Sequence, residues 1–404
     1  MKILVINGDC IQTNTSANLC HLAYICGLLD AGHEVSLLSA DGRDYKTDPA
    51  MVIPADVKHY TIYGTSFYEK ISLKKRERIS KFVKTEIRSV QDSEVNDGIV
   101  QRLKSAALAF YGVHGIYATF VRRAQKFRSD VAYDYVISIS TPVTSHLLTH
   151  NLLQTGHIKA THWIQIWEDP WYSDAYGFNG KTDIFNEEKR LLSFAERICY
   201  VSPLTLNNQQ RLFPESAEKM FWKPLPYYYK NEGTSQISLR RNVYGYFGAY
   251  YPASRDLQPF YEAAKATDIE VNICGDPANL FSATARLHIY PRLSLAELKP
   301  IEDNTNILVF LCNLQGGQIP GKIYQYSATD KTILFILDGT DDEQAVLKDY
   351  FGKFNRYVFC QNTVEDITRA IRQIESGDIG SVRNMPLDDF EPAKIVTSIL
   401  EAGR

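Results

Sequence analysis

The sequence predicts an α/β protein built from two doubly wound domains. Short β-branched runs alternate with longer segments of helical period, which is typical of parallel sheets with helices on both faces. The pattern occurs twice in 404 residues, a length that favours two domains. With 45% hydrophobic and 23% charged residues, the composition excludes disordered, collagen-like and coiled-coil classes.

Strands are expected at five places in each half of the chain. In the first half they are 2–7, 34–39, 133–140, 162–167 and 197–202, and in the second half 243–247, 269–274, 306–311, 332–337 and 357–360. A full helix is expected at 17–31, because apolar residues recur there at spacings of three and four and Gly32 follows.

The domain boundary is expected where Pro and Tyr cluster, since the stretch 223–235 cannot continue a helix or a central strand. The linker is placed near 226–240. This gives an N-terminal domain of residues 1–230, a C-terminal domain of residues 231–385, and a helix in 386–404 that could pack back on the N-terminal domain.

Charge and cysteine content bear on the compartment and on partners. The seven cysteines are odd in number and form no C-x-x-C, which is typical of reduced thiols in a cytosolic protein, and the apolar run Ile3 to Ile6 is too short for a signal peptide.

From Lys70 to Arg128 there are fourteen Lys/Arg and five Asp/Glu, a charge of +9 against −12 for the remainder. Within it, residues 105–121 are too short and interrupted to cross a bilayer. Together with Lys74–Arg88 they fit an aromatic, basic surface for anionic lipid, and by themselves they fit equally a core helix with a solvated, charged neighbour.

Several common signatures are missing from the sequence. It has no G-x-G-x-x-G after the first strand, no G-x-x-x-x-G-K-[ST], no H-E-x-x-H and no G-x-S-x-G, which argues against a nicotinamide dehydrogenase, a P-loop enzyme, a zincin and an α/β-hydrolase. The nine histidines show no metal-ligand spacing, so no metal is expected.

A phosphate site is predicted after the strand ending near Leu311. The segment Q-G-G-Q-I-P-G-K-I-Y-Q-Y, residues 315–326, carries a glycine-rich loop into a helix at Gly321. Backbone N–H groups at a helix start attract anions, and Lys322 adds a full positive charge.

This segment resembles the donor-binding motif P-G-K-x-x-E-Y-x-x-x-x-K-P-I-L of the group 1 glycosyltransferases, a retaining family. The resemblance implies the GT-B fold, two Rossmann-like domains facing a central cleft. In that family a Glu binds the ribose of the nucleotide, and here its position holds Gln325, while the position of a second family acid falls on Gly317. An amide can still bond ribose hydroxyls, but it carries no charge.

A second matching segment is V-Y-G-Y-F-G-A-Y-Y-P-A-S-R-D, residues 243–256. The family places a glycine and two cations here for the diphosphate; this chain has Gly248, Ala249 at the first cation position, and Arg255 at the second, so Lys322 could supply the missing charge. Taken alone, Gly248 is better explained by an ordinary strand-end turn, and only together with the Gly317–Gln325 loop does the sequence favour the diphosphate role.

The N-terminal domain adds two stretches similar to family segments that end strands at the cleft. Residues 135–146 end in His146, and W-I-Q-I-W-E-D-P-W-Y, residues 163–172, contains Trp167, Asp169 and Trp171. Asp169-Pro170 also fits a simple turn, and His146 a helix-start hydrogen-bonding residue. Ser16, after the first strand, is expected either to face the donor phosphates or only to cap a helix.

The resemblance therefore implies a metal-independent, retaining glycosyltransferase that moves a sugar from a nucleotide-diphosphate sugar to an acceptor hydroxyl, in cell-surface polysaccharide or glycolipid assembly. It needs no cofactor, and we expect a glycan or lipid-linked acceptor, no nucleic acid, and a cytoplasmic location, peripheral at the membrane through the basic segment. The alternatives are a scaffold subunit with a degenerate donor site that assists a partner transferase, and a sugar-nucleotide epimerase. The implied site residues are Asp169, Arg255 and Lys322 for catalysis, Ser16, Gly248, Arg255, Gln318, Gly321, Lys322 and Gln325 for the donor, and His146, Trp167 and Trp171 for the acceptor.

Overall fold

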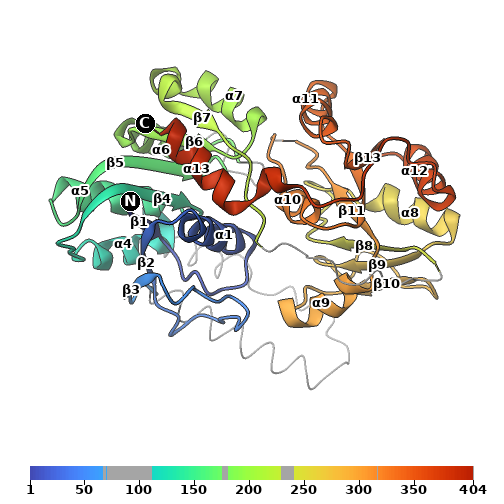
Figure 1. The fold of residues 1–404 in the computed structure, drawn as a ribbon, viewed down its shortest axis with the longest axis horizontal. Coiled ribbons are helices and arrows are strands. Elements are labelled where there is room, and N and C mark those ends of the chain that lie inside the picture. Colours follow the sequence, from blue (N-terminus) through green and yellow to red (C-terminus); the bar gives the residue numbers. More distant parts are fainter. Residues whose placement is uncertain (67–69, 71–111, 175–180, 229–240, 316, 404) are drawn as a thin grey trace, which may run out of the picture.

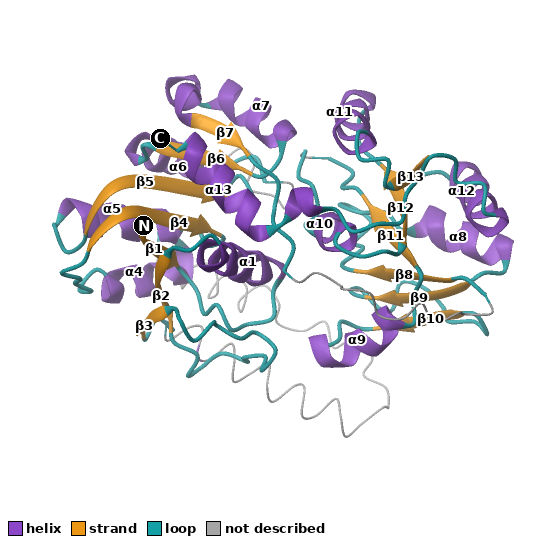
Figure 2. Ribbon diagram, viewed as in Figure 1, coloured by secondary structure: helices purple, strands orange, loops and turns teal. Residues whose placement is uncertain are grey.

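The computed structural model describes residues 1–66, 70, 112–174, 181–228, 241–315 and 317–403. These residues form two separate parallel sheets, each surrounded by helices (Figures 1 and 2). The predicted fold class, two doubly wound α/β domains, is confirmed.

The first sheet has seven parallel strands in the order β3-β2-β1-β4-β5-β6-β7. The strands are β1 (Lys2–Asn7), β2 (Glu34–Ala40), β3 (Lys58–Ile62), β4 (Ala132–Ser140), β5 (Lys159–Trp167), β6 (Arg197–Tyr200) and β7 (Met220–Trp222). The helices are α1 (Ser16–Asp30), α4 (Ala118–Ala124), α5 (Thr144–Gln154), α6 (Thr182–Phe194) and α7 (Pro203–Leu212), with 3₁₀ turns η1 (Gly115–Tyr117) and η2 (Pro214–Lys219).

The second sheet has six parallel strands in the order β10-β9-β8-β11-β12-β13. The strands are β8 (Val243–Phe247), β9 (Glu270–Cys274), β10 (Leu287–Tyr290), β11 (Ile307–Leu311), β12 (Thr332–Leu337) and β13 (Tyr357–Gln361). The helices are α8 (Gln258–Thr267), α9 (Leu295–Asp303), α10 (Lys322–Ser327), α11 (Asp341–Gly352) and α12 (Val364–Ser376).

Strand order reverses at β1 and β4 in the first sheet and at β8 and β11 in the second. In such sheets ligands bind beyond the carboxyl ends of the strands at this reversal. The β1–α1 loop and the loops after β8 and β11 begin at these strand ends. We therefore expect these loops to line a ligand site.

The helix α1 follows β1 because Thr15 caps it: the Thr15 Oγ1 accepts the backbone N–H of Asn18 at 3.1 Å. The helix ends at Asp30, two residues before Gly32, which has φ +79°. It therefore spans Ser16–Asp30, one residue earlier at each end than the sequence predicted.

The C-terminal residues form a short 3₁₀ turn, η3 (Asp388–Phe390), and the helix α13 (Pro392–Ala402). In Figure 1 α13 lies beside α1, in the half of the molecule that holds the first sheet. Gly27 of α1 allows this contact, because a Cβ there would lie 2.5 Å from the backbone of Pro392.

Candidate functional site

A cavity of about 250 Å³ lies between the two domains. The β1–α1 loop and the start of α1 line one side, and the loops after β8, β9 and β10 together with the start of α10 line the other. Five of the donor-binding residues expected from the sequence line this one cavity: Ser16, Gly248, Arg255, Gly321 and Lys322.

Two glycines let the strand ends approach one another at this cavity. The Gly248 N–H donates to the Cys274 carbonyl at 3.0 Å, and a Cβ built on Gly275 would lie 1.8 Å from the Gly248 carbonyl oxygen. Only glycine fits at position 275, which the sequence analysis did not single out.

Three cations border the cavity. The Arg255 Nε donates to the Asn313 Oδ1 at 2.7 Å and its Nη1 to the Ala249 carbonyl at 3.2 Å, while Arg292 Nη2 donates to the Asn14 carbonyl at 3.3 Å, across the two domains. With Lys322 they face one lining carboxylate among the described residues, Asp276. This excess of positive charge suits an anion such as a diphosphate.

The N-terminus of α1 faces the start of α10. A Cβ on Gly321 would lie 3.9 Å from the Ser16 Oγ. Ser16 is the first residue of a 15-residue helix whose cap is Thr15, so its hydroxyl lines the cavity without capping that helix. Because α10 has only six residues, Lys322 and the start of α1 contribute the positive potential there.

A smaller cavity of about 50 Å³ adjoins the first one and shares Ser16, Gly321 and Lys322 with it. Gln325 lines it, and its Oε1 accepts the backbone N–H of Tyr228 at 2.9 Å. Gln325 therefore both borders the cavity and holds the segment that connects the domains.

Gly317 stands at a position where the motif that this segment resembles has an acid, and in this structure the position is crowded. Its φ is +68°, and a Cβ would lie 2.8 Å from the Leu204 Cβ of α7. The Ser202 hydroxyl donates to the Gly317 carbonyl at 2.7 Å. This position joins the two domains and has no room for a Glu side chain.

Asp169 is tied to the same loop. The Gln318 amide donates to the Asp169 and Asp174 carboxylates, and the Asn313 amide donates to the Gln318 carbonyl at 3.1 Å. Since Asn313 also accepts from Arg255, a chain of hydrogen bonds links Arg255 to Asp169. Burial raises the pKa of Asp169 to about 7, and the charges of Glu168 and Asp174 act in the same direction.

Two of the predicted acceptor residues lie in the core. His146 and Trp167 are fully buried and their rings lie 4.5 Å apart. The His146 Nδ1 pairs with the Ser138 hydroxyl at 2.8 Å, and burial lowers the pKa of His146 to about 3. No acceptor can touch these side chains in this structure, so they position the β4 and β5 ends.

Trp171 is only partly buried and stacks on His114 at 5.4 Å. The Glu188 carboxylate accepts the backbone N–H groups of Trp171 at 3.4 Å and Tyr172 at 2.5 Å. Of the three predicted acceptor residues, Trp171 is the one with an exposed surface.

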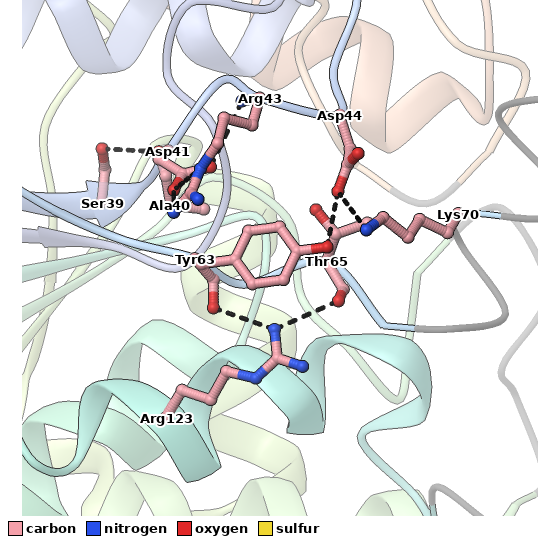
Figure 3. A network of polar contacts seen from close by, with 9 residues as sticks. All are labelled: Ser39, Ala40, Asp41, Arg43, Asp44, Tyr63, Thr65, Lys70 and Arg123. Atoms are coloured by element: carbon pink, nitrogen blue, oxygen red, sulfur yellow. Dashed lines mark hydrogen bonds and ion pairs between the residues drawn. The ribbon is translucent and has the colours of Figure 1, made fainter.

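Most of the basic segment, residues 71–111, lies outside the described residues, and these include residues 105–111 of the stretch 105–121. Its described flanks are fixed to Tyr63 (Figure 3): Lys70 and Arg123 lie 5.2 and 4.7 Å from the Tyr63 ring, and Arg43 lies 4.8 Å from it. Tyr63 donates to the Asp44 carboxylate at 2.7 Å, which also pairs with Lys70 at 3.7 Å. No helix in the described ranges is long and apolar enough to span a membrane.

The sequence analysis missed the residues that hold this site together: Asn313, Gly275, Arg292 and Glu302. Asn313 and Gly275 each follow a predicted strand closely, and polar or glycine residues at strand ends could have indicated them. Arg292 precedes α9 and Glu302 lies in its last turn, and the sequence analysis did not predict this helix.

No family model matches the sequence, and no curated protein matches it. Among solved structures, sucrose-phosphate synthase from Thermosynechococcus elongatus is similar, with a TM-score of 0.55, 11% identity, and 99% and 98% of the two chains covered. A glycosyltransferase from Rickettsia africae ESF-5 has a TM-score of 0.52 and 10% identity over 100% of this chain and 94% of that one. The UDP-GlcNAc 2-epimerase from Methanocaldococcus jannaschii has a TM-score of 0.51 and 10% identity over the whole of both chains. These likenesses, together with the two facing parallel sheets, show that the chain has the GT-B fold.

Proposed function

We propose that this protein transfers a sugar from a nucleotide-diphosphate sugar to an acceptor hydroxyl. The observation that carries the proposal is the cationic cavity between the domains, with Arg255 and Lys322 beside Gly248 and Gly321. The diphosphate lies among these groups, against the start of α1 at Ser16. The nucleoside extends into the smaller cavity near Gln325.

The chemistry depends on the leaving nucleoside diphosphate, on which negative charge develops as the sugar departs. Preorganised cations stabilise that charge, and removing one such group typically costs about 2.7–4 kcal/mol of barrier. Arg255 is held by Asn313 and Ala249, so it is oriented before the donor binds. On this proposal the protein's own cations serve the diphosphate and neither a metal nor a cofactor is required; retention of configuration is implied by the family resemblance.

Asp169 is the proposed proton-handling residue. With its pKa raised to about 7, it can take or release a proton near neutral pH, which suits transfer from an acceptor hydroxyl. Its link through Gln318 and Asn313 to Arg255 supports a role for Asp169 in concert with the donor-binding residues.

The acceptor is proposed to be a glycan or lipid-linked sugar, bound by the N-terminal domain near Trp171, in polysaccharide or glycolipid assembly. The +9 segment from Lys70 to Arg128 supports a peripheral position at the inner face of a membrane, since anionic lipid is its natural partner. Gln318 contributes to the donor side by holding the loop before Gly321.

A sugar-nucleotide epimerase is the second candidate, because the epimerase from Methanocaldococcus jannaschii shares this fold over its whole length. A scaffold subunit is the third, since Gly317 and Gln325 replace acids of the family motif. The transferase releases nucleoside diphosphate and glycosylates an acceptor, the epimerase converts the donor without an acceptor, and the scaffold leaves the donor unchanged.

The test begins with a thermal-shift screen of nucleoside diphosphates, because a bound ligand raises the melting temperature. Donor consumption is then measured for the wild type, Lys322→Ala, Arg255→Ala and the exposed control Lys265→Ala. We expect Lys322→Ala and Arg255→Ala each to lower turnover about 100-fold or more with the melting temperature retained, and Lys265→Ala to match the wild type. Wild-type turnover in both cavity variants would show that the donor binds elsewhere.

A further inference from the structure

We infer that the open edge of the second sheet binds a second copy of this chain, so that β13 pairs with its own counterpart across a two-fold axis. The inference does not depend on the proposed function. It concerns a groove that shares no lining residue with either cavity between the domains.

This groove, of about 570 Å³, lies along β13, the last strand of the second sheet. Its walls are the helices α11 and α12, and β13 lies between them (Figures 1 and 2). The helix α11 packs on one face of the sheet through Leu347 and Phe351, and α12 packs on the other face through Ile367 and Ile371. Since residues of β13 line the groove, the helices leave the edge of the sheet open between them.

The backbone of β13 offers hydrogen bonds at this edge. The Asn362 N–H donates to the Leu337 carbonyl of β12 at 3.0 Å. Because the backbone groups of successive strand residues point to opposite sides, Tyr357, Phe359 and Gln361 turn their N–H groups away from β12. No strand in the part of the chain that the structure describes pairs with β13 on that side. Such an edge is a template for another strand.

The strand β13 also lacks the features that protect the other sheet edges. Its sequence, Y-V-F-C-Q, contains no charged residue and no proline. The edge strand β3 has the same length but carries Lys58 and His59, and the edge strands β7 and β10 have only three and four residues. Short or charged edges resist pairing. Of the edges that the structure describes, β13 is therefore the best suited to receive another strand.

The charges on the groove favour a second copy as the occupant. Along α11 the acid Asp341 and the base Lys348 line the groove two helical turns apart, and α12 adds the acid Asp366 and the base Arg369. These charges balance, so the groove has no preference for an acidic or a basic peptide. A two-fold axis through β13 sets each helix antiparallel to its counterpart, which brings Asp341 of one copy opposite Lys348 of the other.

The backbone and the small side chains fit the same arrangement. In an antiparallel pair of β13 strands centred on Phe359, the N–H of each Phe359 donates to the carbonyl of the other. Tyr357 of one copy then lies opposite Gln361 of the other. Ala345 of α11 and Ala370 of α12 stand between the charged residues on the two walls, and their small side chains let the paired helices approach.

Analytical ultracentrifugation of the full chain over a range of concentrations tests the inference. We expect the wild type to form a dimer. Asp341→Lys and Lys348→Glu each place like charges opposite one another at two symmetric contacts, and each should weaken dimerisation about tenfold or more. Asp349→Lys changes the charge of the same helix outside the groove and should dimerise like the wild type.

Mixing the two groove variants separates a lost contact from a lost fold. In a mixed dimer of Asp341→Lys with Lys348→Glu, both contacts between the α11 helices again join opposite charges. We therefore expect the mixture to dimerise with nearly the affinity of the wild type, which misfolded chains would not do. The chain that carries both substitutions should also dimerise.

A wild type that stays monomeric at every concentration overturns the inference. It is overturned in the same way if the monomer binds a synthetic peptide of residues 356–362, because the edge then serves a different partner. A dimer that both single variants leave intact also contradicts it, since the two copies would meet at another surface.

Discussion

At position 317 the structure has no room for a side chain, which the sequence alone could not show. The backbone there adopts φ +68°, and a Cβ would lie 2.8 Å from the Leu204 Cβ of α7. A side chain as large as an acid therefore does not fit at this position while the domains are in this contact. The spacing of the motif pointed to position 317, but the contact of this position with α7 is visible only in the folded protein.

Gly317→Ala should destabilise the protein more than Gly380→Ala. Both glycines have positive φ, at +68° and +60°, which costs an alanine about 1 kcal/mol. Only at 317 does the new Cβ meet a neighbour, at 2.8 Å, which adds about 1–3 kcal/mol of crowding. Thermal or urea denaturation measures both variants. Equal losses would show that α7 does not press on this loop.

Asp169 should make the stability of the protein depend on pH. Its pKa is raised from the ordinary value of 3.8 to about 7, so the folded state holds a proton at pH values where the unfolded chain has released it. The free energy of unfolding therefore falls as the pH rises from about 4 through about 7, and stays reduced above that.

Asp169→Asn removes this titration while its amide oxygen still accepts from Gln318. We expect the variant to gain melting temperature over the wild type at pH 8 and to gain little at pH 5. The exposed acid Asp378 provides the control, and Asp378→Asn should follow the wild-type pH profile. Parallel profiles for Asp169→Asn and the wild type would contradict the burial of this carboxyl.

At the scale of elements, the sequence predicted every central strand and missed three edge strands. The strands β1 and β12 are buried along most or all of their length, so their continuous apolar runs are unmistakable. β3, β7 and β10 lie at sheet edges, have five, three and four residues, and are partly exposed. Each of these edge strands forms by pairing with another strand, and the local residue pattern carries no information about that partner strand.

The candidate site divides in the same way. Residues in the segments that follow strands β8 and β11, such as Gly248, Arg255 and Lys322, were predicted, because parallel strands bring their carboxyl ends to one edge. Glu302 and Arg292 enter the cavities through the packing of α9. Conversely, Trp167 ends a cleft-side strand but points into the core, since alternate residues of a strand face opposite sides of the sheet.

The N-cap of α1 links helix stability to the cavity. Thr15 and Thr363 cap α1 and α12 with the same geometry, each hydroxyl accepting an N–H three residues on. Thr15→Ala and Thr363→Ala should each cost about 1 kcal/mol. Only Thr15→Ala should also weaken nucleoside diphosphate binding, because Ser16 lines the cavity. Melting curves with and without nucleotide measure both effects, and equal nucleotide-induced shifts in the two variants would remove α1 from the site.

At the scale of the whole molecule, charge is distributed unevenly: the segment from Lys70 to Arg128 carries +9 on a chain of net charge −3. Tyr63 and Asp44 fix its described flanks to the N-terminal domain (Figure 3). Any anionic surface that it binds is therefore held at a fixed domain, the one proposed to receive the acceptor.

Vesicle binding should follow from that charge. We expect the protein to bind anionic vesicles and not neutral ones, with an affinity that falls as salt rises, because exposed charges are screened over about 8 Å at physiological ionic strength. Reversing Lys74, Lys75 and Arg76 to Glu should abolish binding, whereas reversing Lys265, Lys299 and Arg383 changes the net charge equally and should leave it. Sedimentation with vesicles decides between them, and identical losses in the two triple variants would mean that net charge alone governs binding.

The return of α13 to α1 means that the chain crosses between the two domains twice, once before β8 and once before α13. The crossings lie side by side, joined by a hydrogen bond of 3.1 Å from the Tyr227 N–H to the Phe390 carbonyl. A single crossing would leave the domains freer to rotate against each other than two crossings that are tied together. Any rotation that separates Ser16 from Gly321 must therefore displace both crossings at once.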